Sequence, residues 1–163
     1  FEQLAELKAD DASSWKYLGI VYAEQNRYVE AANAYARAVA LDSTQVDLWK
    51  RLGEMSVKSG NFLDAEAAFT HVLRLHADDV DARFALAKVF YQLDNVVGAI
   101  RQCEILLSEY AFDHKLATVF LGKLYIEAKR YVDSQMLIQS AYLRWPEDEQ
   151  VQMLIGDIKK MEK

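Results

Sequence analysis

The sequence predicts an all-α fold built from repeated pairs of antiparallel helices, and two observations support this prediction. First, the 163 residues contain only six glycines and one proline, too few for the tight turns of an all-β sandwich or barrel. Second, the chain repeats itself every 34 residues, so that Trp15 recurs as Trp49 and Leu18 recurs as Leu52. Self-similarity at such a period is typical of a solenoid, in which stacked repeats share one core.

Three columns of equivalent positions run through four repeats. The first column contains Trp15, Trp49, Arg83 and Thr118. The second column contains Ala31, Ala65, Ala99 and Ser134. The third column contains Tyr35, Phe69, Cys103 and Ile138. The spacing is 34 residues twice and then 35, so we expect one inserted residue in the third repeat, within 108–114.

Within each repeat the spacing predicts two helices. Trp15, Leu18 and Tyr22 stand at i, i+3 and i+7, which places them on one face of a helix. The pattern breaks at 25–27 and resumes at Tyr28 with a second helix.

The break between the two helices carries turn residues in the middle repeats. It falls at Gly60 and Asn61 in the second repeat, and at Asp94 and Asn95 in the third. These residue types tolerate the left-handed backbone that ends a helix.

The period assigns the whole chain, as one solenoid domain. The four repeats are residues 12–45, 46–79, 80–114 and 115–148. Residues 149–163 predict a capping helix with a polar outer face, which a solenoid needs at its end. Residues 1–11 predict the end of a truncated preceding repeat, so we expect a longer protein or self-association through the face near Phe1.

Four glycines stand in the middle of predicted helices, where each costs about 1 kcal/mol relative to alanine. They are Gly19, Gly53, Gly122 and Gly156. A cost repeated at one place in the repeat needs a reason. We expect a close approach of two helix backbones, helped by the small residues of the second column.

These residues resemble a known family. Trp15-x2-Leu18-Gly19-x2-Tyr22, followed by Ala31-x3-Tyr35, is similar to the tetratricopeptide repeat, and the resemblance covers nearly the whole chain. It implies a right-handed superhelical solenoid whose first helices line a concave face. The departures from the family pattern are Ser56 for Tyr, Arg83 and Thr118 for Trp, and Cys103 for an aromatic residue.

The residues give no support for catalysis, and we expect no enzyme activity, no cofactor and no metal. Cys103 falls on a buried face and predicts a packed thiol. His71 and His76 are five positions apart and do not converge on an ion, whereas His114 has no clear partner. Asp79 precedes a helix and predicts an N-cap.

Charge and hydropathy exclude two classes of partner. The formal net charge of −6 argues against nucleic-acid binding, which requires clustered positive charge. The longest stretch without a charged residue, 134–143, is far shorter than the roughly 18 apolar residues of a membrane span. We therefore expect neither nucleic-acid binding nor membrane insertion, and the sequence does not indicate a compartment.

A concave groove is the expected binding surface, lined by residues one step around each first helix from the buried face. The predicted groove residues are Lys50, Glu54, Phe84, Lys88, Tyr91, Val119, Lys123 and Ile126. The earlier first helices offer mixed charges, with Lys16, Ile20 and Ala23 on the first of them. The later ones offer apolar side chains to grip a partner, with lysines to hold its carboxylates.

Two alternatives stay open for the later repeats, one for the apolar groove residues and one for two aromatic residues near the insertion. In the first, Phe84, Val119 and Ile126 pack against neighbouring helices instead of binding a ligand. In the second, Tyr110 and Phe112 near the insertion form another contact surface, although burial of both under a neighbouring helix is the simpler expectation.

The resemblance also suggests the clamp with which some family members hold the acidic tail of a chaperone. Lys16 matches one clamp lysine. Ile20, Arg51, Asp81 and Ala85 stand where that clamp needs other residues, so chaperone-tail binding is not expected.

Two functions remain compatible with the sequence. One is a non-catalytic protein-protein interaction scaffold that binds a peptide or partner protein in its groove. The alternative is an accessory repeat segment of a larger enzyme or of a secretion or envelope assembly protein, where the repeats mediate self-assembly or positioning.

Overall fold

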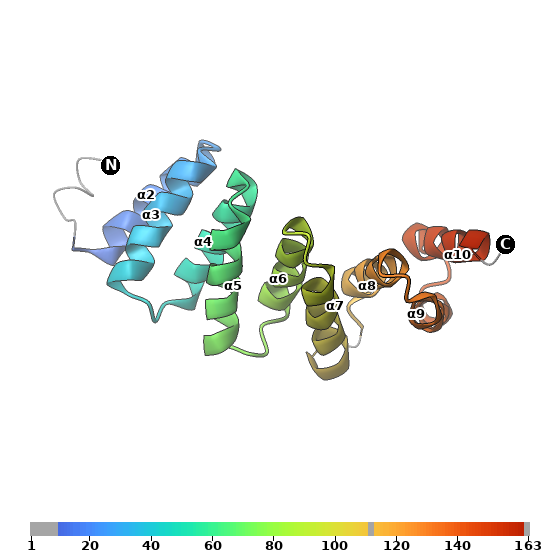
Figure 1. Ribbon diagram of the computed structural model, residues 1–163. Helices are drawn as coiled ribbons and strands as arrows, with labels where there is room; N and C mark the ends of the chain where they lie inside the picture. The colour runs from blue at the N-terminus through green and yellow to red at the C-terminus, as the bar shows by residue number, and fades with distance from the viewer. Residues whose placement is uncertain (1–9, 111–112, 162–163) are drawn as a thin grey trace. The chain divides into compact units, whose positions relative to one another are not determined.

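A computed structural model describes residues 10–110 and 113–161, and every regular element in these ranges is helical, as predicted (Figure 1). The predictions made for Phe1 and Phe112 fall outside the described residues. Contacts divide the chain into two compact parts, which we call unit 1, ending at Leu93, and unit 2, beginning at Asp94. The boundary falls in the turn inside the predicted third repeat, and the single solenoid domain stays a prediction.

The helices follow the predicted order. Unit 1 contains α2 (Ala12–Glu24), α3 (Tyr28–Leu41), α4 (Val46–Ser59), α5 (Phe62–Leu75) and α6 (Val80–Gln92). Unit 2 contains α7 (Val96–Ile105), the π-helical turn η1 (Leu106–Tyr110), α8 (Lys115–Glu127), α9 (Tyr131–Arg144) and α10 (Glu149–Met161).

Local residue chemistry sets the helix ends. The turn residues Asn26, Gly60, Asp94 and Lys129 all have left-handed backbones, with φ between 58° and 80°. The prediction for Gly60 and Asp94 is therefore confirmed. Asn61, which follows Gly60, instead begins the next helix: its side chain accepts a hydrogen bond from the Asp64 amide.

Helix caps account for two polar residues that the sequence singled out. The Asp79 carboxylate accepts a hydrogen bond from the Ala82 amide at 2.9 Å, which confirms the predicted N-cap. His114, for which no partner was expected, caps α8 because its Nδ1 accepts a hydrogen bond from the Ala117 amide at 3.0 Å. Both caps satisfy backbone amides that a helix start leaves without intrahelical acceptors.

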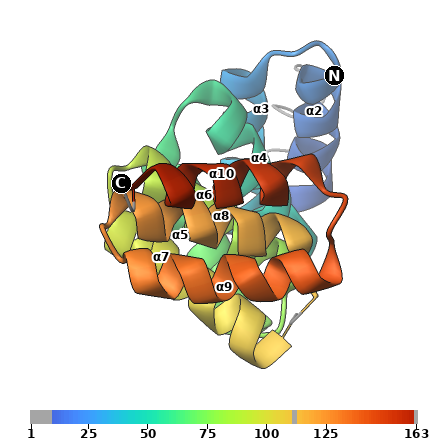
Figure 2. The same ribbon diagram turned by 90° about the vertical axis from the view of Figure 1, so that its right-hand side faces the viewer.

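Consecutive helices pack against one another within each unit. One core cluster of unit 1 joins α3 and α4 through Ala31, Tyr35, Ala38, Val39, Leu48, Leu52 and Met55. A second joins α5 and α6 through Ala65, Phe69, Val72, Ala82, Leu86 and Val89. In unit 2, α10 packs on both α8 and α9, and the three helices run side by side (Figure 2). Their shared core contains Val119, Ile138, Ala141, Val151, Leu154 and Ile158.

The mid-helix glycines make room for side chains of the partner helix. A Cβ added at Gly53 would lie 2.7 Å from the Phe69 ring, and one at Gly19 would lie 2.9 Å from the Tyr35 ring. The close approach is therefore between the first helix and the third column of side chains. Gly156 is different, because an added Cβ there would meet nothing within 4 Å, so the close-approach explanation is wrong for that glycine.

The inserted residue of the third repeat coincides with a widened helical turn. The π-helical turn η1 overlaps the predicted insertion range at 108–110. A π-turn absorbs one extra residue without ending a helix, which gives the insertion a physical reason. Tyr110 at its end is 38% exposed, so the expected burial of this tyrosine is wrong.

Candidate protein-binding site

The first helices of the first two repeats enclose a recess, which we call the unit 1 cleft. Its volume is about 560 Å³, and it lies between α2 and α4. The side chains that line it are Lys16, Ile20, Ala23, Glu24, Tyr35, Asp47, Leu48, Lys50, Arg51, Glu54, Met55 and Lys58. The residues predicted for this face, including Lys50 and Glu54, are thus brought together in one recess.

The apolar part of the cleft combines buried and accessible side chains. Leu48 and Met55 are buried core residues, and the Tyr35 ring is 2% exposed. Burial also raises the pKa of the Tyr35 phenol above its ordinary value. Ile20 is 36% exposed and belongs to the same lining, so it offers apolar surface to a ligand.

Several charged groups of the cleft already have partners within unit 1. Lys50 forms an ion pair with Asp79 at 2.5 Å, and its hydrogen bond to Asp79 raises the pKa of Lys50. Arg51 pairs with Glu54 at 3.2 Å. The Lys58 ammonium lies 5.1 Å from the centre of the Tyr28 ring, a cation–π contact.

Three other charged side chains, Lys16, Glu24 and Asp47, also line the cleft. In the described part of the chain, no ion pair joins Lys16, Glu24 or Asp47 to another side chain. These three groups carry both signs of charge and come from both helices of the cleft. Within these ranges their charges are not neutralised by a salt bridge.

The predicted residues of α6 form a separate patch in unit 1. The Lys88 ammonium lies 4.8 Å from the centre of the half-buried Phe84 ring. Tyr91, on the same helix, is 39% exposed. None of the three lines the unit 1 cleft.

In unit 2 the prediction for one groove residue is wrong. Val119 is 4% exposed and belongs to the core shared with α9 and α10, so its side chain packs internally and is not on a binding face. Ile126 is half-buried and packs against the same cluster, whereas Lys123 is exposed. Val119 is equivalent to Lys50. Val119 shares a core with α9 and α10, whereas Lys50 pairs with Asp79, the N-cap residue of α6.

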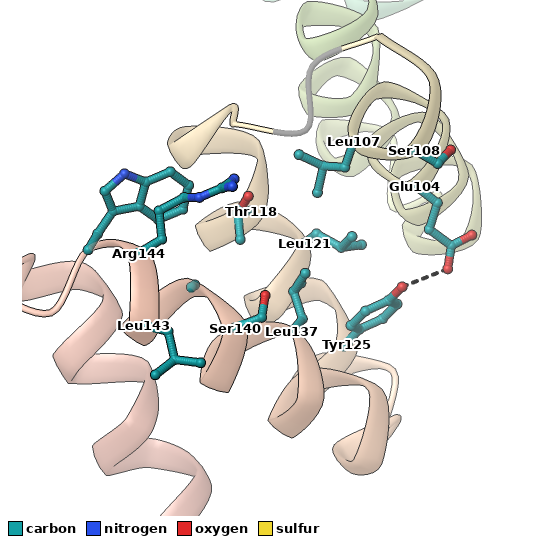
Figure 3. A pocket seen from close by; sticks show the side chains of 12 residues that line it. Glu104, Leu107, Ser108, Thr118, Leu121, Tyr125, Leu137, Ser140, Leu143 and Arg144 are labelled. Carbon is teal, nitrogen blue, oxygen red and sulfur yellow. Dashed lines mark hydrogen bonds between the residues drawn. The ribbon is translucent and has the colours of Figure 1, made fainter.

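A second recess, which we call the unit 2 pocket, was not predicted. It has a volume of about 710 Å³ and lies among α7, η1, α8 and α9 (Figure 3). It is lined by Glu104, Leu107, Ser108, Thr118, Leu121, Tyr125, Leu137, Ser140, Ala141, Leu143, Arg144 and Trp145. The sequence does hold a signal for this pocket. Thr118 stands at the position equivalent to Trp49, and Ser140 stands at the position equivalent to His71, so two large rings are replaced by small side chains.

Each end of the unit 2 pocket has one charged lining residue that is already paired, Glu104 at one end and Arg144 at the other. At one end the Tyr125 hydroxyl donates to Glu104 at 2.8 Å (Figure 3). Arg130 donates to the same carboxylate at 3.1 Å. Burial, together with this hydrogen bond, raises the pKa of the Tyr125 phenol. At the other end Arg144 pairs with Asp113, and its guanidinium carbon lies 5.9 Å from the centre of the Trp145 ring.

Cys103 is fully buried, as predicted. Burial raises the pKa of its thiol to about 12, so the thiolate that would act as nucleophile or metal ligand is disfavoured at neutral pH. No helix in the described ranges has the length and hydropathy of a membrane-spanning segment.

These features define an all-helical repeat protein with recessed surfaces between its helices. Models of the tetratricopeptide repeat match residues 12–45 and residues 52–114, which together make up more than half of the chain. The chain therefore belongs to the tetratricopeptide repeat family.

Solved structures share this fold at low sequence identity. The MamA protein superposes with a TM-score of 0.78 and 17% identity, over 90% of this chain and 79% of MamA. YrrB is described as a tetratricopeptide repeat protein with an unusual peptide-binding site. It superposes with a TM-score of 0.68 and 15% identity, over 96% of this chain and 89% of YrrB. The first tetratricopeptide repeat domain of Spaghetti (RPAP3), bound to an HSP90 peptide, superposes with a TM-score of 0.65 and 21% identity. The match covers 73% of this chain and 94% of the Spaghetti chain. No curated protein matches the sequence.

Proposed function

We propose that this protein is a protein-protein interaction scaffold that binds a peptide segment of a partner protein in the unit 1 cleft. The observation that carries the proposal is the cleft itself, which combines accessible apolar surface at Ile20 with charges of both signs. Tetratricopeptide repeats are generally interaction modules without catalytic activity. The peptide-bound or peptide-binding descriptions of two similar structures support a peptide as the ligand class.

The chemistry of the cleft suggests how a peptide is held. An apolar side chain of the peptide contacts Ile20 and Ala23, and charged neighbours pair with Lys16, Glu24 or Asp47. Such an arrangement of an apolar centre and a polar rim is common at protein interfaces. Lys50 and Arg51 contribute less to the binding energy, since each is already paired with a carboxylate.

The proposal also assigns a role to the predicted residues outside the cleft. A contact patch on α6 consists of Phe84, Lys88 and Tyr91. The Lys88 ammonium, which lies over the Phe84 ring, can also form an ion pair with a partner's carboxylate. Lys123 and the accessible part of Ile126 offer a smaller patch on α8. Each patch, taken separately, can add contacts to a partner that is larger than one short peptide.

A peptide selected from a displayed library against the whole chain provides the ligand for the test. Ile20→Asp places a charge in the cleft without entering the core, because Ile20 is 36% exposed. Leu63→Asp is the matched control: it makes the same change on α5, where Leu63 is 68% exposed and outside the cleft. Fluorescence anisotropy should show at least a tenfold weaker complex for Ile20→Asp and unchanged binding for Leu63→Asp.

Two results would contradict the proposal. One is wild-type affinity in Ile20→Asp, and the other is an equal loss in both variants. Circular dichroism of the two variants checks that each keeps the helical content of the wild type.

The alternative of a self-assembling accessory segment stays a prediction. Light scattering across a dilution series tests it directly. A molar mass that rises with concentration favours self-assembly, and a constant monomer mass argues against it.

A further inference from the structure

A stacked pair of side chains recurs in unit 1. In the first two repeats, the tryptophan of the first helix is covered by a side chain 22 positions further along the chain. The Arg37 guanidinium lies 5.4 Å from the centre of the Trp15 ring. The His71 ring stacks on Trp49 with ring centres 4.1 Å apart and an angle of 24° between the planes.

The fourth repeat lacks both members of this pair. Thr118 occupies the column of Trp15 and Trp49, and Ser140 lies 22 positions further, in the column of Arg37 and His71. Both residues line the unit 2 pocket (Figure 3). The pocket therefore lies where the second repeat holds two stacked rings, and two small hydroxyl-bearing side chains leave that volume open.

We propose that the unit 2 pocket binds an aromatic side chain of a partner protein, next to an acidic residue of the same partner. The evidence for the aromatic group is the shape of the site, because the equivalent positions of the second repeat hold a stacked indole and imidazole. The walls are suited to an aromatic ring: the half-buried Leu107 and Leu137 supply apolar surface, and Trp145 supplies an indole.

Charge at the pocket's ends determines which flanking residue fits. Glu104 is already engaged by Tyr125 and by the Arg130 cation. Arg144, at the other end, pairs with Asp113, a carboxylate whose side chain is 75% exposed. A guanidinium carries five N–H donors, so Arg144 can bind a partner's carboxylate without giving up the partners that it already has. An acidic neighbour of the aromatic residue therefore complements this end.

This site is independent of the unit 1 cleft, since all its lining residues belong to unit 2. The two sites take different ligands, a peptide with mixed charges in the cleft and an aromatic anchor in the pocket. Failure of one proposal leaves the other in place.

The test uses the whole chain labelled with ¹⁵N and the probe N-acetyl-Asp-Trp-amide, followed by amide chemical shifts. We expect saturable shifts at Thr118, Leu121 and Ser140. The comparison probe N-acetyl-Asp-Ala-amide, which keeps the acid but lacks the ring, should cause no such shifts. Equal shifts with both probes, or shifts outside unit 2, would overturn the proposal.

One variant at the pocket's rim and a matched control outside the pocket sharpen the test. Leu143→Asn alters a side chain that lines the pocket and is 82% exposed, so folding should be preserved. Val132→Asn is the matched control on the same helix, 70% exposed and outside the pocket. The dissociation constant should rise at least threefold for Leu143→Asn and stay unchanged for Val132→Asn. Equal constants in wild type and Leu143→Asn would contradict the site.

A filling variant gives an independent readout. Thr118→Trp with Ser140→His restores the ring pair of the second repeat and should abolish probe binding. If this double variant fails to fold, the comparison of Leu143→Asn with Val132→Asn decides the question alone.

Discussion

Substituting alanine for glycine should have opposite effects at two equivalent positions. Gly53 and Gly156 both lie within helices, where alanine is favoured by about 1 kcal/mol. At Gly53 an added Cβ lies 2.7 Å from the Phe69 ring, whereas ordinary contacts begin at 3.4 Å. The ring must therefore retreat by about 0.7 Å, the difference between these two distances. Phe69 is 4% exposed and packed among core residues, so it has no free space to enter.

The magnitudes determine the sign of each change. Overpacking a dense core costs about 1–3 kcal/mol. The helix-propensity gain of about 1 kcal/mol offsets part of this cost. Gly53→Ala should therefore lower the free energy of unfolding by about 1 kcal/mol. Gly156→Ala meets nothing within 4 Å and should raise it by about 0.5–1 kcal/mol. In a chain of this size, each kcal/mol shifts the melting temperature by about 2–4 °C.

Urea unfolding followed by circular dichroism measures both variants against the wild type. A third variant, Gly53→Ala with Phe69→Leu, removes the ring that the new Cβ meets and should show a favourable coupling in a double-mutant cycle. The reasoning is refuted if Gly53→Ala stabilises the protein as much as Gly156→Ala does.

Three other predictions concern buried or paired groups. Ser56→Ala should raise the free energy of unfolding by about 1 kcal/mol in urea titrations, because the fully buried Ser56 Oγ has no hydrogen-bond partner among the described residues. A destabilised variant would contradict this. Partial burial tends to raise the pKa of Asp79, but hydrogen bonds from Lys50 and the Ala82 amide outweigh it and leave this pKa lowered. The ion pair thus stabilises the fold above the unfolded-state pKa near 3.8, and that contribution is lost as pH falls through the lower folded-state value. Lys50→Met should therefore lower the melting temperature at pH 7 but hardly at pH 2; an equal loss at both would argue against the pair. Cys103 should react with a thiol reagent only in denaturant, and rapid labelling of the native protein would disprove its burial.

The sequence predicted most of the fold because its signals are local or periodic. Trp15, Leu18 and Tyr22 define a helical face whatever packs on it, and Gly60 marks a helix end through its own backbone freedom. The unit 1 cleft was also foreseeable, since the position of Ile20 on its helix follows from the buried stripe.

The remaining features depend on contacts that no single helix encodes. Val119 was expected on a binding face, but it lies in a core shared with α9 and α10, and the periodicity of α8 alone does not reveal that core. The inserted residue was located by alignment, but its accommodation as a π-turn depends on how α7 continues into η1. The unit 2 pocket required two columns to be considered together, because Thr118 and Ser140 are each unremarkable as single substitutions.

A crystal structure of the whole chain with the library-selected peptide tests the central claim most directly. The interaction-scaffold account predicts peptide density between α2 and α4, in van der Waals contact with Ile20. Density against the outer faces of α3 and α5, with the cleft empty, would contradict it.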